Sequence, residues 1–252
     1  MSDDKLISVI MASNKIDNYL YDAVQSILLQ SYKSIELIFV ANGPNSSDIF
    51  KYLNHKFSDP RLKIIETPIA QLSFSLNLGI SISKGEYIAR MDADDLSQPE
   101  RLHKQLSYML DNNLDMVASD LLLINANGDP IGVRRYPKKI DNINKQLPYR
   151  NTFAHNTVLI KKAFILKARG YNSGFNSEDY DLWLRLKRHN INWDNMSECI
   201  LKYRIHDEST QRKRLGYAES AGYSLREMLL KFSFTKFLAV IFHIIKSYAR
   251  SK

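Results

Sequence analysis

A short apolar run that ends in three carboxylates is the feature that most constrains this chain. Residues 85–95 read Gly-Glu-Tyr-Ile-Ala-Arg-Met-Asp-Ala-Asp-Asp, and residues 87–91 have the composition of a strand. Carboxylates gathered at a strand end suit a hard divalent cation, and Mg²⁺ or Mn²⁺ held in this way usually keeps substrate phosphates in its shell. Asp92 and Asp94 therefore predict a metal site that binds a phosphate compound. Asp95 alone is equally well explained as a turn former or helix N-cap.

Strand and helix patterns alternate around this stretch. The expected elements are strands at 6–11, 35–40 and 62–65 and helices at 20–28, 73–82 and 99–110. Asn18 is the expected N-cap of the first helix. Such units usually form a parallel sheet covered by helices, which bind ligands beyond the carboxyl ends of the strands. We therefore expect Asn42-Gly43 and the aspartates to face one crevice.

The second half of the chain has a different pattern of apolar and polar residues. A hairpin is expected from the apolar runs 116–123 and 131–135, joined by the turn signal Asn127-Gly128. Residues 136–156 look irregular, and residues 179–188 have helical spacing. The acidic pair Glu178-Asp179 begins that helix. Acids are favourable at a helix N-terminus, but a carboxylate facing the metal corner would also be a general base for a hydroxyl nucleophile.

Residues 203–212 carry two arginines and a histidine between polar side chains. His206 is either a metal ligand, a diphosphate donor or an ordinary surface residue, and Arg204 and Arg212 either neutralise a leaving phosphate or solvate a loop. His155 is more easily explained as structural. The chain has no Gly-x-x-x-x-Gly-Lys phosphate loop and no dinucleotide-binding fingerprint.

Composition narrows the class of protein. The chain has 252 residues, a net charge of +8 and a single cysteine, Cys199, which excludes a disulfide framework and fits a reducing compartment. The N-terminus lacks the shape of a signal peptide, so we expect a cytoplasmic protein. Residues 202–252 contribute +7 of the charge. Because that excess lies in a segment with much apolar content, a nucleic-acid partner is not expected.

Four segments resemble glycosyltransferase family 2, and especially its bacterial members that build O-antigen, capsule and exopolysaccharide. They are residues 7–14, 26–40, 76–95 and 177–186, of which 76–95 is the most specific. The likeness extends from about residue 6 to 215. Two places depart from the family pattern. Asn42 stands where the family commonly has an acidic residue that contacts the nucleotide base, and Met11-Ala12-Ser13 replaces the frequent Pro-Thr-Tyr.

The resemblance implies an α/β protein with the GT-A fold, a mixed but mostly parallel sheet flanked by helices, at residues 1–215. It also implies an inverting transfer from a nucleotide-diphosphate sugar, favouring a UDP-sugar, with Mn²⁺ or Mg²⁺ as cofactor. The acceptor would be a hydroxyl of a polyprenyl-diphosphate-linked saccharide. Two alternatives stay open: a non-catalytic nucleotide-sugar or carbohydrate-binding protein of the same fold, and a sugar nucleotidyltransferase.

The family's roles then fall on matching positions of this sequence. Asp179 would be the catalytic base, Asp94 and His206 would bind the metal, and Asp92 would hold the ribose or a metal-bound water. The nucleotide-sugar would also contact Ala12, Ser13, Asn42, Arg90, Ala93 and Arg212. Further contacts to donor or acceptor sugar would come from Glu178, Trp183 and His155.

Residues 216–252 are expected to form a basic, apolar helical extension. The apolar run 237–245 is far shorter than the roughly 20 residues that span a bilayer, but basic residues surround it. Such a segment either lies on the anionic inner leaflet, which would suit a lipid-linked acceptor, or packs as a helix on the body of the protein. The first alternative makes the protein peripheral on the cytoplasmic face of the inner membrane.

Overall fold

The computed structural model describes residues 5–172, 174, 176–205 and 214–249. The first half contains β1 (Ile7–Ser13), α1 (Leu20–Leu28), β2 (Ile35–Asn42), α2 (Ser46–Lys56), β3 (Leu62–Thr67), α3 (Leu72–Ile82), β4 (Tyr87–Arg90), β5 (Leu96–Ser97) and α4 (Arg101–Asp111). The second half contains β6 (Met116–Ile124), β7 (Pro130–Arg134), α5 (Ile140–Gln146), β8 (Leu159–Lys161), α6 (Lys162–Lys167), α7 (Glu178–Arg188), β9 (Trp193–Arg204), α8 (Arg214–Leu230) and α9 (Phe234–Ala249).

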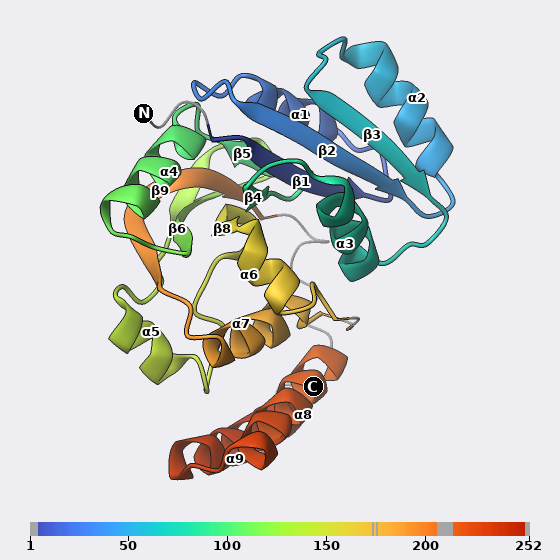
Figure 1. Cartoon of the computed structure of the whole chain (residues 1–252). Helices are drawn as coiled ribbons and strands as arrows, with labels where there is room; N and C mark the ends of the chain where they lie inside the picture. Colours follow the sequence, from blue (N-terminus) through green and yellow to red (C-terminus); the bar gives the residue numbers. More distant parts are fainter. Residues whose placement is uncertain (1–4, 173, 175, 206–213, 250–252) are drawn as a thin grey trace.

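One curled sheet organises the described residues (Figure 1). Its strand order is β3-β2-β1-β4-β8-β6-β9-β5, and β7 pairs with β6. Strands β1, β2, β3 and β4 are parallel, whereas β8 runs antiparallel to both β4 and β6. Because β1 lies between β2 and β4 with matched register, the carboxyl ends of these three strands share one edge. Asn42 and the aspartates therefore follow strands that end at the same edge of the sheet, as expected.

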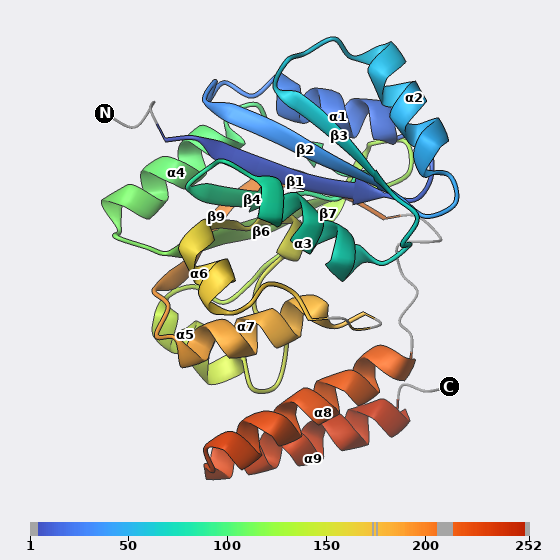
Figure 2. The ribbon, with the colours of Figure 1, turned by 45° about the vertical axis from the view of Figure 1, so that its right-hand side comes forward.

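Helices cover both faces of the sheet (Figures 1 and 2). On one face α1, α2 and α4 bury their apolar stripes against the parallel strands, in a core that includes Val24, Leu53 and Leu106. On the other face α3, α6 and α7 form a second core, which includes Ile80 and Trp183. This two-sided burial explains why β1 and β2 are almost continuously apolar in sequence.

Most expected elements are present, with local differences. The turn expected at Asn127-Gly128 joins β6 to β7, and Gly128 has the positive φ (+93°) that glycine adopts without steric cost. The cap prediction for Asn18 is wrong: Asp17 Oδ1 accepts hydrogen bonds from the amides of Tyr19 and Leu20 at 3.0 and 3.1 Å. Helices α2 and α5 and strand β9 were not expected from the sequence.

The expected C-terminal helical extension is an antiparallel hairpin of α8 and α9 beside α7 (Figure 2). Buried charges join it to the body of the protein. The carboxylate of Asp181, which has no exposed surface, lies 2.8 Å from Arg185 Nε of the same helix and 2.5 Å from Arg226 Nη1 of α8. The segment thus packs on the body of the protein, and its contact with the membrane stays a prediction. A boundary between residues 215 and 216 stays a prediction.

Replacing Asp181 with alanine should destabilise the protein by about 3–5 kcal/mol, because it leaves two arginines without their shared buried partner. Urea unfolding measures this, with Asp111→Ala, at an exposed helix end, as the control. A loss below about 1 kcal/mol, the range of a surface pair, would mean that the hairpin is not held by this carboxylate.

Candidate active site

The acidic cluster lies just beyond the end of β4. One carboxylate oxygen from each of Asp92, Asp94 and Asp95 lies within 4.8 Å of the others, which is close enough for a shared cation. Asp92 and Asp94 are partly exposed, whereas Asp95 is completely buried. All three offer the hard oxygen ligands that Mg²⁺ and Mn²⁺ prefer. The residues present therefore fit the predicted metal.

Asp95 anchors the turn that carries this cluster. Its carboxylate accepts hydrogen bonds from the Asn156 side chain and, at 3.0 Å, from the Arg204 amide. Burial raises the pKa of Asp95 well above its usual value, and the negative charges of Asp92 and Asp94 raise it further. Asp95 is thus a buried turn residue and not the helix N-cap that its position also suggested.

Arg204 holds the same turn from the end of β9. Its Nε donates to the Asp94 carbonyl at 3.0 Å, its Nη1 donates to the Ala126 carbonyl at 2.9 Å, and its guanidinium lies 4.2 Å from the centre of the Tyr19 ring. The side chain is buried. The interpretation that Arg204 either neutralises a leaving phosphate or solvates a loop is therefore wrong, because its donors already support the acidic turn.

Arg90, the last residue of β4, connects the cluster to the rest of the site. It is buried and forms an ion pair with Asp92, and its carbonyl accepts a 2.7 Å hydrogen bond from Arg101. Its Nε and Nη1 have no hydrogen-bond partner among the described residues. Buried guanidinium atoms without partners are costly, so their presence beside Asp92 is typical of a ligand site.

The start of α7 supplies the second pair of acids. Asp179 accepts hydrogen bonds from the Asn151 side chain and, at 2.7 Å, from the Tyr180 amide. Burial, followed by the charge of Asp179, raises the pKa of Glu178 to about 7, and burial also raises the pKa of Asp179. Arg90 lowers both pKa values, and Asp92 raises that of Glu178. The charges of the two acidic elements thus influence one another.

The coupled acids predict how activity depends on pH. A carboxylate base works only when it is ionised, so transfer should increase as the pH rises through the raised pKa of Asp179. The neighbouring Glu178 has a pKa of about 7. Replacing Glu178 with glutamine removes the neighbouring negative charge and should move this acid limb to lower pH. The measurement is kcat/KM as a function of pH, with Glu198→Gln as a distant control. If the acid limb does not move, the charge of Glu178 does not influence the pKa of the base.

Two aromatic candidates have different positions. His155 is partly exposed, its Nε2 lies 2.7 Å from the Tyr171 hydroxyl, and burial together with the nearby Arg90 lowers its pKa well below the usual value. A neutral His155 beside Arg90 is compatible with a sugar contact. Trp183 has no exposed surface and packs edge-on against Phe153 and His155. The prediction of a sugar contact by Trp183 is therefore wrong, because this ring belongs to the core.

The remaining predicted residues lie at the strand edge or outside the described residues. Ala12, Ser13 and Ala93 are partly exposed beyond β1 and β4. Asn42 is buried at the end of β2, and its Nδ2 donates to Ser75 Oγ at 2.9 Å, which leaves the second hydrogen of that nitrogen for a base contact. His206 and Arg212 fall outside the described residues.

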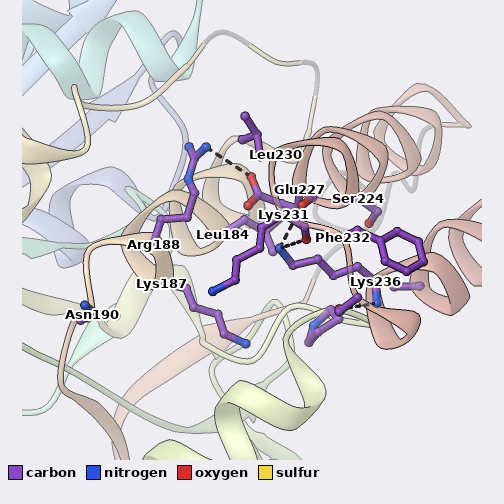
Figure 3. Close-up of a pocket in the computed structure, with 13 residues that line it drawn as sticks. Leu184, Lys187, Arg188, Asn190, Ser224, Glu227, Leu230, Lys231, Phe232 and Lys236 are labelled. Carbon is purple, nitrogen blue, oxygen red and sulfur yellow. Dashed lines mark hydrogen bonds and ion pairs between the residues drawn. The ribbon is translucent and has the colours of Figure 1, made fainter.

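Sequence reasoning missed the residues that orient the acids. Asn151 and Asn156 bind carboxylates of the two acidic elements, and Arg101 lies fully buried beneath Arg90. Single polar residues in an irregular stretch carry no periodic signal. Two cavities border the α7 start: one of about 470 Å³ between α3 and Glu178, and one of about 280 Å³ beside Asp179. A third, of about 510 Å³, lies at the hairpin turn (Figure 3) and contains none of the candidate site residues.

Comparison with known proteins decides the family. The family model described as "Glycosyl transferase family 2" matches residues 8–169, which include the acidic cluster. This chain belongs to glycosyl transferase family 2. It is 51% identical over 245 residues to the Escherichia coli "O-antigen biosynthesis glycosyltransferase WbnJ", with 96% of each chain covered. It is also 30% identical to the E. coli "UDP-Glc:alpha-D-GlcNAc-diphosphoundecaprenol beta-1,3-glucosyltransferase WfgD", with 82% of this chain and 80% of that protein covered.

Solved structures of glycosyltransferases share its fold. S. aureus TarS 1-349 in complex with UDP-GlcNAc superposes with a TM-score of 0.73 at 14% identity, covering 97% of this chain and 73% of that one. A mannosyltransferase from Pyrobaculum calidifontis in complex with GDP-Man and Mn²⁺ gives a TM-score of 0.68 at 12% identity, covering 97% and 70%. The expected GT-A fold and the expected glycosyltransferase class are thereby confirmed, and neither open alternative is favoured.

Proposed function

We propose that this family 2 glycosyltransferase moves a sugar, with inversion, from a UDP-sugar to a hydroxyl of a lipid-linked surface-polysaccharide intermediate. The observation that carries the proposal is the electrostatic interaction between the β4 and α7 acids, in which Arg90 lowers and Asp92 raises the pKa of Glu178. One element can hold the charged donor while the other removes the acceptor proton. WbnJ and WfgD, whose names place them in O-antigen and lipid-linked sugar assembly, support the acceptor class.

Donor binding is assigned to the β4 side of the site. Asp94, assisted by Asp92, would hold Mn²⁺ or Mg²⁺, and His206 would complete the ligands. When bound, the cation acts as a Lewis acid that offsets negative charge on the departing diphosphate. The unpartnered Nε and Nη1 of Arg90 can donate to donor oxygens. Ala12, Ser13, Asn42, Ala93 and Arg212 are proposed to surround the nucleotide.

Proton removal is assigned to Asp179. The Asn151 and Tyr180 hydrogen bonds fix the carboxylate, and its raised pKa makes it a stronger base than an ordinary aspartate. Direct attack of the activated hydroxyl on the anomeric carbon, without a covalent intermediate, inverts that centre. Glu178 and His155 are proposed as sugar contacts at the same site.

A donor screen tests this proposal. The purified protein is incubated with Mn²⁺, GlcNAc linked to a polyprenyl diphosphate, and each of a panel of UDP- and GDP-sugars, and nucleotide release is measured. We expect one UDP-sugar to give release that depends on the acceptor. Release from no donor would refute the proposal, and acceptor-dependent release from a GDP-sugar alone would refute its UDP part.

We also propose that the hairpin turn rests on the cytoplasmic face of the inner membrane. Leu229, Phe232 and Phe234 around the turn are 74%, 71% and 68% exposed. Lys187, Arg188, Lys231 and Lys236 line the adjoining cavity with a single acid, Glu227 (Figure 3). Apolar side chains flanked by cations suit anionic lipid. None of the described helices combines the length and apolar character needed to cross a bilayer.

Replacing Leu229, Phe232 and Phe234 together with serine should weaken binding to phosphatidylglycerol vesicles by at least about 100-fold, since each buried apolar side chain contributes about 1.5–3 kcal/mol. Vesicle flotation measures this. The matched control replaces Ile131, Val133 and Leu166, which are exposed elsewhere, with serine. Equal flotation of the two triple variants would rule out the hairpin turn as the membrane contact.

A further inference from the structure

The cavity of about 280 Å³ beside Asp179 is built partly by the C-terminal hairpin. Its lining comes from the segment after α5, from the start of α7 and from both helices of the hairpin. It comprises Arg150, Asn151, Asn176, Ser177, Asp179, Tyr180, Gly216, Tyr217, Ser220, His243 and Lys246. The hairpin therefore forms one wall of the space next to the proposed catalytic base.

The charged side chains of this cavity suit the binding of an anion next to the proposed catalytic base. Among the described residues that line it, Asp179 is the single acid, and the cations are Arg150 and Lys246. Arg150 is exposed, and its guanidinium makes no hydrogen bond or ion pair with any other residue that the structure describes. Lys246 Nζ lies 5.4 Å from the centre of the Tyr217 ring and 5.6 Å from that of Phe242, which hold it in place.

The hairpin wall cannot shift easily relative to Asp179. Ser177 Oγ, next to the acids of α7, donates to the Gly216 carbonyl of α8 at 2.8 Å. The Tyr180 hydroxyl donates to the Pro148 carbonyl at 2.9 Å and lies 3.2 Å from His243 Nε2 of α9. Contacts on both sides of Asp179 thus connect the base to both helices of the hairpin, and the second of these helices carries Lys246.

We propose that this cavity binds the diphosphate of the acceptor. Arg150 and Lys246 hold the diphosphate that joins the acceptor sugar to its lipid, so that the sugar hydroxyl lies at Asp179. The guanidinium can bind phosphate oxygens in pairs, while the ammonium acts as a point charge. Phe242, which is 43% exposed, shares a face of α9 with Lys246 four residues later and lies three residues before Ile245, which is 61% exposed. These two side chains provide an apolar path for the first isoprene units. This inference rests on the proposed function.

Acceptor kinetics test the proposal directly. Two acceptors carry the same sugar, one as a prenyl diphosphate ester and one as a neutral octyl glycoside. Arg150→Gln and Lys246→Gln should each raise KM for the diphosphate acceptor about tenfold or more, the effect of losing one hydrogen bond to a charged group. The donor KM and the KM for the octyl glycoside should not change, and Lys246→Arg should restore binding. The control is Lys145→Gln, an equal charge change on exposed α5. Equal effects on both acceptors, or none, would overturn the proposal.

A binding measurement separates the site from the catalytic function. Calorimetry with geranyl diphosphate in EDTA should detect binding to the wild type that weakens tenfold or more in both variants, with no binding of geraniol. If this holds while no sugar is transferred, the diphosphate site stands and the proposed function fails. If transfer occurs but geranyl diphosphate binds all variants equally, the function stands and this site fails. If phosphatidylglycerol vesicles compete with geranyl diphosphate, the cavity binds a phospholipid headgroup and the proposal is wrong.

Discussion

Sugar transfer should fall by at least about 100-fold when Asp179 is replaced with asparagine, while donor binding stays nearly intact. General base catalysis contributes about 10²–10⁴-fold, and asparagine keeps the size of the side chain but cannot accept the acceptor proton. Because burial already disfavours the charged form of Asp179, the neutral variant should fold normally. The measurement is single-turnover transfer, combined with calorimetric titration of the donor in the presence of Mn²⁺.

Two comparisons make the Asp179 result specific. Asp141→Asn, on the exposed surface of α5, should transfer sugar at the wild-type rate. The pH profile of the residual Asp179→Asn activity should lose the acid limb of the wild-type profile. A variant that keeps more than about a tenth of the wild-type rate would show that another group removes the proton.

Donor affinity should lose its dependence on Mn²⁺ when Asp94 is replaced with alanine. Asp94 is partly exposed, and its carboxylate lies within 4.8 Å of the carboxylates of Asp92 and Asp95. It is the carboxylate proposed as the protein ligand of the cation. Removing one carboxylate ligand from a cation held by few protein groups should weaken metal-dependent donor binding by more than about tenfold.

Calorimetry with and without Mn²⁺ measures the Asp94 effect. Asp111→Ala, an exposed aspartate at the end of α4, controls for the loss of a negative charge. Thermal unfolding should change little, because Asp95 and Arg204 still anchor the turn. If the donor affinity in Mn²⁺ is unchanged, Asp94 is not a metal ligand.

The sequence predicts the parallel half of the sheet well because each of those strands carries its own signal. The runs around Val9 and Ile38 are buried on both faces, so they read as strands without any knowledge of their neighbours. Strand β9 is different: its residues Trp193–Arg204 mix polar and apolar side chains, and it is a strand because it pairs with β6 and β5. Such a strand is specified by tertiary contacts rather than by local pattern.

The same distinction applies to the site. Asp92, Asp94 and Asp179 were predictable because acids at a strand end and at a helix start have a chemical meaning in sequence. Trp183 was misassigned as a sugar contact although it belongs to the apolar side of the predicted helix, the side that packs in the core. Arg204 was misassigned because its partners, among them Tyr19 and Asp94, are far away in sequence.

Helix α7 limits how the C-terminal hairpin can be exchanged between related enzymes. The helix begins with the acids of the site, its Asp181 pairs with Arg226 of α8, and its last turn borders the cavity at the hairpin turn. A graft that exchanged the hairpin alone would bring in a foreign partner for a buried carboxylate. An exchange of the hairpin must consequently carry a matching residue at position 181 of α7, while β9, which lies between α7 and α8 in the chain and pairs with β6 and β5, stays in place.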